Sequence, residues 1–76
     1  MDSSDQVNQT ERFRPSHVLI RDEAWYAEGP QQARPPDGIL REGTRVRLVA
    51  ENGSYSVVET VTGQTAHLAS GALQAL

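Results

Sequence analysis

The sequence contains no cysteine, which excludes disulfides, thiolate catalysis and thiolate metal ligands together. It also contains no lysine, and all 7 basic residues are arginine. We attribute this bias to genome composition. No hydrophobic run approaches the roughly 20 residues of a membrane span. Residues 1–10 have neither the basic start nor the apolar centre of a signal peptide. If Met1 is the native start, we therefore expect a cytoplasmic protein with no membrane partner.

Charge and length also limit the function. The net charge is −3, whereas nucleic acids and anionic membranes are bound by a basic field, so we expect neither as a general partner. At 76 residues the chain has room for one core. Residues 1–12 are almost entirely polar, and we expect a disordered tail there because so little apolar surface cannot offset the entropy of ordering. Residues 13–76 form the predicted domain.

The clearest strand pattern lies between residues 44 and 50. Val46, Leu48 and Ala50 alternate with polar side chains, which is typical of a strand with one buried face. Val49 interrupts the polar side and indicates partial cover there. The segment therefore predicts an amphipathic strand in a small sheet.

Two more strands and a closing turn follow. The Asn-Gly pair within residues 51–54 permits a tight hairpin, and a strand rich in Tyr, Val and Thr follows at 55–61. A third strand at 64–68 and one helical turn at 72–76 complete the chain. The hydrophobic lining that we expect includes Val46, Leu48, Val57 and Leu68.

The N-terminal half contains shorter elements around a long loop. Residues 17–20 predict a strand with Val18 and Ile20 on one face, and residues 24–27 predict an extended segment with most of the aromatic side chains. Residues 28–38 hold three of the 4 prolines. Proline lacks the donor that helices and central strands need, so this segment is a predicted loop.

The spacing of the turn residues carries a family resemblance. The first set of matching residues is Gly29, Pro30, Leu40, Gly43 and Thr44, and the second is Asn52, Gly53, Tyr55, Val57, Gly63, Thr65 and Leu73. Their joint spacing over residues 16–76 resembles the bacterial SH3 (SH3b) domain. The resemblance implies an all-β fold, a small SH3-like barrel of five to six short antiparallel strands with a terminal helical turn.

The chain departs from that family at several aromatic positions. Ser54 stands where the family usually has Trp, and Ala66 and His67 replace a glycine-aromatic pair. Ala72 stands where peptide-binding SH3 domains have Tyr in the closing turn. Several walls of the usual ligand groove are therefore missing, and binding of proline peptides or cell walls does not follow from the resemblance alone.

An aromatic groove is nevertheless the leading site prediction. Trp25 and Tyr26 are adjacent, so in a strand one ring points to the core and the other to solvent. An exposed ring beside a proline-bearing loop would receive an extended peptide or a sugar ring, although barrel packing alone also explains both residues. The predicted ligand site consists of Trp25 or Tyr26, Pro35, Pro36 and Tyr55.

We expect no catalytic site, metal or cofactor. The two histidines, His17 and His67, would need carboxylates to hold zinc, and their spacing matches no metal motif. A Ser/His/acid set can be assembled from Ser54 or Ser70 with His67 and Glu59, but no strained nucleophile turn supports it. The pattern therefore favours a protein that is not an enzyme.

A nucleic-acid binding role would depend on a basic stripe on the surface. Arg41, Arg45 and Arg47 fall on or beside one strand. Acidic residues expected nearby would neutralise it and leave a solvated face of mixed charge. These acidic residues are Glu42, Glu51 and Glu59.

The sequence thus favours a non-enzymatic, SH3-like binding module of bacterial type that recognises a protein or peptide by shape and aromatic stacking. Two structural roles stay open: a small subunit docked on a larger assembly, and a barrel that forms homo-oligomers through an open sheet edge. Binding of a cell-wall glycan or of nucleic acid ranks below these.

Overall fold

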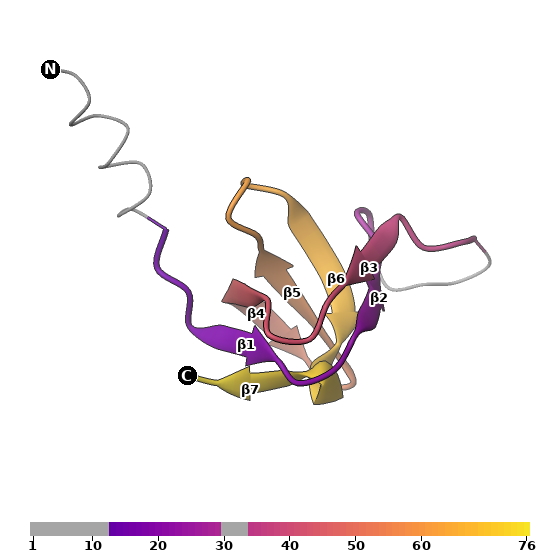
Figure 1. Cartoon of the computed structure of the whole chain (residues 1–76). Coiled ribbons are helices and arrows are strands. Elements are labelled where there is room, and N and C mark those ends of the chain that lie inside the picture. The colour runs from indigo at the N-terminus through magenta and orange to yellow at the C-terminus, as the bar shows by residue number, and fades with distance from the viewer. Residues whose placement is uncertain (1–12, 30–33) are drawn as a thin grey trace, which may run out of the picture.

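The structure is a computed structural model that describes residues 13–29 and 34–76. The predicted tail at 1–12 and Pro30 lie outside the described residues. Within them, no helix is long and apolar enough to cross a membrane. The elements (Figure 1) are β1 (His17–Leu19), β2 (Glu23–Trp25), β3 (Gly38–Leu40), β4 (Arg45–Asn52), β5 (Tyr55–Glu59), β6 (Thr65–Ala69), the 3-10 turn η1 (Ser70–Ala72) and β7 (Leu73–Ala75).

The strands form two antiparallel sheets that meet at one point. Five strands form a sheet in the order β6-β5-β4-β1-β7, and β2 and β3 form a separate pair. Tyr26, directly after β2, makes an isolated antiparallel bridge with His67 of β6. In Figure 1 the β2–β3 pair accordingly stands beside β6. The small all-β fold predicted from the sequence is confirmed. The closing turn is the 3-10 turn η1 at Ser70–Ala72, and the helical turn predicted at 72–76 is wrong in its placement, because Leu73–Ala75 form strand β7.

The core is small and draws on most of the elements. Four partly buried residues, Trp25, Leu40, Leu48 and Leu73, pack against it. A domain of about this size buries only about 60% of the surface of its unfolded chain, so each core contact is a large share of the total stability. The buried hydrophobic residues of the described chain are Leu19, Val46, Val58, Ala66, Leu68 and Ala72.

The predicted lining is right on three strand positions and wrong at Val57. Val46 and Leu68 are buried and Leu48 packs against the core, whereas the inward positions of β5 are Ser56 and Val58. Because the side-chain repeat of a strand is two residues, an error of one position exchanges the two faces. A serine in the core hid the true alternation from the sequence pattern.

The buried side chain of the first strand is Leu19. β1 ends at Leu19, which is 1% exposed, whereas Ile20 is 46% exposed. β1 lies between β4 and β7 and pairs with both. The sequence pattern grouped Val18 with Ile20 and did not single out Leu19 as the buried position.

A register shift explains why Ala50 is exposed. The pairing of β4 with β5 shifts between Leu48 and Ala50, so Val49 is an extra residue in the ladder. An inserted residue reverses the alternation beyond it, and Ala50 turns to solvent against the prediction. The Leu48 N–H donates to the Ser16 Oγ at 2.9 Å, which holds the strand just before the shift.

Candidate functional site

The adjacent aromatic residues Trp25 and Tyr26 face different sides of the β2–β3 hairpin. Trp25 packs against the core, and Tyr26 lines a groove with Tyr55. This divergence is what their adjacency in an extended segment predicts. The two rings therefore belong to two separate hollows of the surface, which differ in chemistry.

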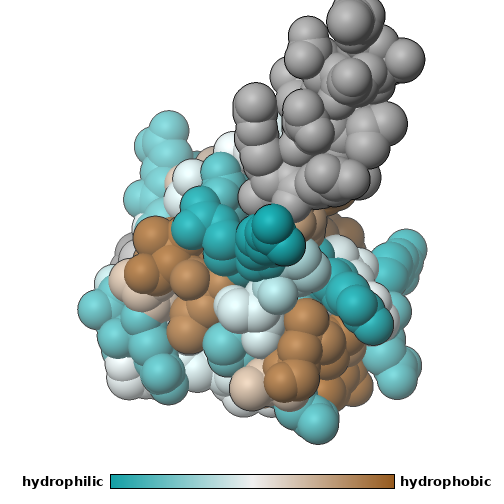
Figure 2. All heavy atoms as spheres, turned by 90° about the vertical axis from the view of Figure 1, so that its left-hand side faces the viewer, coloured by the Kyte–Doolittle hydropathy of each residue, from teal (hydrophilic) through white to brown (hydrophobic). Residues whose placement is uncertain are grey.

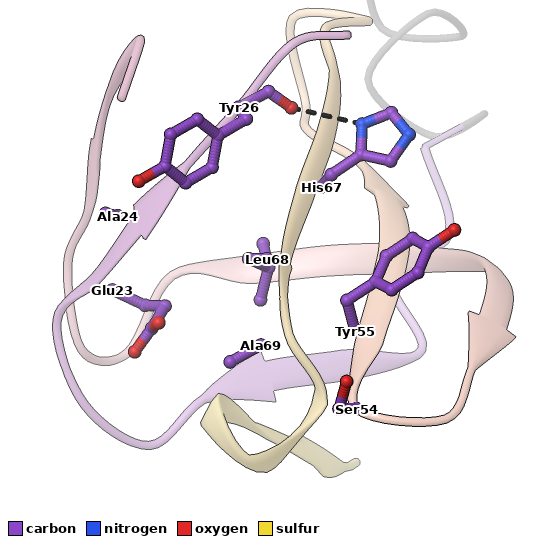
Figure 3. A pocket seen from close by; sticks show the side chains of 8 residues that line it. All are labelled: Glu23, Ala24, Tyr26, Ser54, Tyr55, His67, Leu68 and Ala69. Carbon is purple, nitrogen blue, oxygen red and sulfur yellow. Dashed lines mark hydrogen bonds between the residues drawn. The ribbon is translucent and has the colours of Figure 1, made fainter. Parts of the chain in front are cut away.

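The groove beside Tyr26 has a volume of about 250 Å³ and lies over β6. In Figure 3, Tyr26 and Glu23 lie on one side of β6 and Tyr55 and Ser54 on the other. Leu68 of β6 belongs to the core, so the floor of the groove is continuous with it. The lining consists of Glu23, Ala24, Tyr26, Ser54, Tyr55, His67, Leu68 and Ala69.

His67 lines this groove and is held by the backbone of Tyr26. The Tyr26 N–H donates to the His67 carbonyl at 3.0 Å, and the His67 N–H donates to the Tyr26 carbonyl at 2.8 Å. The His67 Nδ1 lies 3.1 Å from the same Tyr26 carbonyl (Figure 3). Because a carbonyl oxygen only accepts, Nδ1 carries the proton of this bond.

Tyr55 is placed at the rim by the turn that precedes it. Gly53 has a φ of 70°, a left-handed conformation that favours glycine and permits the tight turn between β4 and β5. The Tyr55 and His67 ring centroids are 6.1 Å apart, with the planes tilted by 33°. This spacing is within the range of aromatic pairs, so the two rings form one continuous aromatic wall.

A chain of hydroxyl groups that starts at the buried Ser56 links that turn to η1. The Ser70 Oγ donates to the Gly53 carbonyl at 2.8 Å and lies 2.7 Å from the Ser56 Oγ. Since the single Ser70 proton is used on the carbonyl, Ser56, which is 1% exposed, must donate to Ser70. The Ser70 N–H also donates to the Ser54 carbonyl at 2.9 Å. The rim that carries Tyr55 is thus tied to η1 through Ser70.

Asp37 closes the long loop beside the groove. Its Oδ2 accepts the Ala27 N–H at 2.7 Å, and its own N–H donates to the Trp25 carbonyl at 2.9 Å. Pro35 and Pro36, which precede it, are exposed, and neither lines the groove that holds Tyr26 and Tyr55. The structure therefore brings together two of the predicted site residues and places the prolines outside their groove.

Trp25 lines a second hollow of about 370 Å³ on the other side of the hairpin. Leu40 and Val61 provide its other large apolar side chains, and Arg45 lies at its edge. The indole packs directly on Gly38, its cross-strand partner, because a Cβ at Gly38 would lie 2.8 Å from the Trp25 Nε1. Trp25 is therefore wedged between the backbone and the core.

Carboxylates at and beside the Tyr26 groove are paired with arginines. Glu23 is the carboxylate in the lining, and it forms an ion pair with Arg21, which does not line the groove. Next to it, Asp22 accepts the Glu42 backbone N–H at 2.8 Å and an Arg41 N–H at 3.1 Å. These two bonds, the backbone bond above all, hold the pKa of Asp22 below its usual range.

The expected basic stripe is partly neutralised, though by different partners. Glu59 pairs with Arg47 as predicted, but Arg41 pairs with Asp22. The described residues contain no group of three or more side chains suited to a metal ion. His17 does not line the groove, and its Nδ1 lies 2.8 Å from the Ser16 Oγ.

Sequence reasoning missed Glu23 and His67 as groove residues. Each residue lies in a stretch that is polar or has no clear hydrophobic pattern. The bridge between Tyr26 and His67 brings both to one surface. No family model, curated protein or solved structure matches this chain.

Proposed function

We propose that this protein is a non-enzymatic, SH3-like binding module that recognises an extended segment of a protein partner in the groove between Tyr26 and Tyr55. The observation that carries the proposal is the wall formed by Tyr55 and His67, with centroids 6.1 Å apart, facing Tyr26 across β6. Aromatic side chains supply large contact area at low conformational cost, which suits the recognition of a peptide.

The fixed position of the rings supports this role. The Tyr26–His67 backbone bridge and the serine chain beneath Tyr55 set both sides of the groove before any ligand arrives. A rigid site loses less entropy on binding than a mobile one. The order of elements also fits an SH3-like module, with a long loop between β2 and β3, the turn at Gly53 and η1 before β7.

The test is selection of ligands from a random dodecapeptide library displayed on phage, with the folded domain as bait. Selected peptides, made synthetically, should bind wild type and lose about tenfold or more in affinity for Tyr55→Ala and for Tyr26→Ala, because aromatic contacts at the centre of a site dominate binding energy. Val61→Ala is the matched control, since Val61 is 65% exposed and lines the Trp25 hollow instead.

Backbone amide spectra separate lost binding from lost folding. If Tyr26→Ala is unfolded, Tyr26→Leu keeps apolar volume at the position and replaces it in the comparison. Failure to select any peptide, or peptides that bind both tyrosine variants as tightly as wild type, would refute the proposed function.

Self-association is the second candidate, and the hollow beside Trp25 favours it. Val61 and Leu40 leave apolar surface there, and Val61 is 65% exposed. On the face shown in Figure 2, hydrophobic side chains gather in two areas separated by hydrophilic ones. Sedimentation at increasing concentration should then show dimers that Val61→Ser weakens, and a constant monomer mass would exclude this role.

A further inference from the structure

The hollow beside Trp25 is a second surface site that shares no lining residue with the Tyr26 groove. The apolar part of its lining consists of the Trp25 indole, Leu40 and Val61, and its volume of about 370 Å³ lies within the range of small-molecule sites. Threonine and glutamine side chains complete the lining, and Arg45 is its one charged residue. A ligand that fits this hollow would be mainly apolar, with one anionic end.

Contacts within the chain hold the hollow in shape. The Nε1 edge of the indole packs on Gly38, where an added Cβ would lie only 2.8 Å from Nε1. The turn that carries Val61 is closed by backbone bonds of Thr60. Its N–H donates to the Gln64 carbonyl at 2.9 Å, and its carbonyl accepts the Gly63 N–H at 2.9 Å. The hollow therefore exists before a ligand arrives, which lowers the entropic cost of binding.

Arg45 differs from four other arginines in having no carboxylate partner among the described residues. Each of the four forms an ion pair, whereas none of the ion pairs within residues 13–29 and 34–76 involves Arg45, which is exposed. A guanidinium binds a carboxylate through two parallel hydrogen bonds. The charge of Arg45 is therefore available to a ligand. The four paired arginines are Arg21, Arg34, Arg41 and Arg47.

The surroundings of Val61 add further positive charge. Arg14 and Arg47 line an adjacent hollow, which shares Thr60 and Val61 with the hollow beside Trp25. Glu59 is the carboxylate of that adjacent lining, and it is paired with Arg47. Arginines thus outnumber carboxylates around Val61, and this local field favours an anion although the net charge of the chain is −3.

We propose that the hollow beside Trp25 binds a small apolar carboxylate, an aromatic or hydrocarbon group that carries one carboxylate. The apolar part lies against Trp25, Leu40 and Val61, and the carboxylate pairs with Arg45. This site is separate from the Tyr26 groove, so the inference goes beyond the proposed function and does not depend on it. The ligand uses the same surface as self-association through Val61, so ligand and dimer exclude each other.

The experiment titrates ¹⁵N-labelled domain with cinnamate and with cinnamamide, its neutral isostere, and sedimentation at the same protein concentration gives the oligomeric state. We expect cinnamate to shift the Trp25 indole N–H and the backbone amides of Arg45 and Val61, and to leave those of Tyr26 and Tyr55 in place. Cinnamate should bind about threefold more tightly than cinnamamide, which is the scale of an exposed ion pair.

Two variants separate the charged contact from the apolar one. Arg45→Gln should remove the preference for cinnamate and leave the affinity for cinnamamide unchanged. Val61→Ser should weaken binding of both probes about threefold or more, because it removes apolar surface from the lining. Arg41→Gln makes the same charge change at a residue that pairs with Asp22 and does not line the hollow, so this control should keep the preference.

Several results would overturn the carboxylate site. These are equal affinity for the two probes, a preference that survives in Arg45→Gln, shifts centred on Tyr26 and Tyr55, and no shift at the hollow up to the solubility limit of cinnamate. A domain that stays dimeric throughout and whose indole N–H ignores both probes would also overturn it and would support self-association instead. None of these results measures peptide binding, so this inference and the proposed function fail separately.

Discussion

The two sides of the β2–β3 hairpin each carry one aromatic ring, and the two rings differ in how they are held. Trp25 rests on Gly38 and packs against the core, whereas Tyr26 is held through its backbone and leaves its ring at a groove. The first side is apolar with Arg45 at its edge, and the second has the carboxylate of Glu23. Two adjacent residues at the end of β2 thus differ: the Trp25 ring packs against the core, and the Tyr26 ring lines a surface groove.

Removing each ring in turn tests most directly whether the two sides of the hairpin differ. Trp25→Ala should lower the free energy of unfolding by about 3 kcal/mol, because a large aromatic side chain packed on a core leaves a cavity. Tyr26→Ala should cost about 1 kcal/mol, since its backbone bridge to His67 survives. Urea unfolding followed by fluorescence or circular dichroism measures both, and equal losses would remove the distinction between the two sides.

A methyl group at Gly38 tests the Trp25 side alone. The new Cβ would meet the Trp25 Nε1 at 2.8 Å, too close for the indole to stay where it is. Gly38→Ala should therefore destabilise the domain by about 2 kcal/mol and move the indole resonance. Gly63→Ala is an unsuitable control because its φ of 90° adds strain, so Gly71→Ala, with only a 3.9 Å neighbour, serves instead. A neutral Gly38→Ala would contradict this packing.

The serine chain tests the Tyr55 side. Ser70→Ala leaves the buried Ser56 hydroxyl and the Gly53 carbonyl without this partner, and should cost about 1–2 kcal/mol of stability. Removing both hydroxyls in Ser56→Ala/Ser70→Ala should cost less than the sum of the single changes, because no buried donor remains. Strict additivity in a double-mutant cycle would show that the two hydroxyls are not coupled.

The smallest expected effect concerns the exposed charges next to Glu23. The pKa of Asp22 is lowered in the folded state, so its bonds to Glu42 and Arg41 stabilise the fold above the unfolded pKa of about 3.9. That contribution is lost as the pH falls through the lower folded pKa. Asp22→Asn should reduce the melting temperature slightly at pH 7 and match wild type in strong acid. A difference that persists unchanged to about pH 2 would contradict this linkage.

Local pattern was sufficient for the turns and for the direction of the adjacent rings. The Asn-Gly turn before Tyr55 and the opposite faces of Trp25 and Tyr26 follow from residue chemistry within a few positions. Local sequence pattern could not predict the pairing of residues far apart in the chain. His67 joins Tyr26 only through a bridge between residues 41 apart in sequence.

Two local irregularities also made the predicted alternation of buried and exposed residues wrong. Ser56 occupies a core position because Ser70 satisfies its hydroxyl, and the register shift after Leu48 turns Ala50 outward. Each depends on a partner from another element, which a repeat of two residues does not encode. Pro35 and Pro36 lie outside the strands, as their residue type predicts, but they also lie outside the groove lining.

The measurement that tests the division between the two sides most directly is a titration of ¹⁵N-labelled domain with a phage-selected peptide. We predict large shifts for the backbone amides of Tyr26, Tyr55 and His67, with the Trp25 indole N–H nearly unmoved. Shifts centred on the Trp25 indole and Arg45, with the tyrosine amides unchanged, would contradict the account.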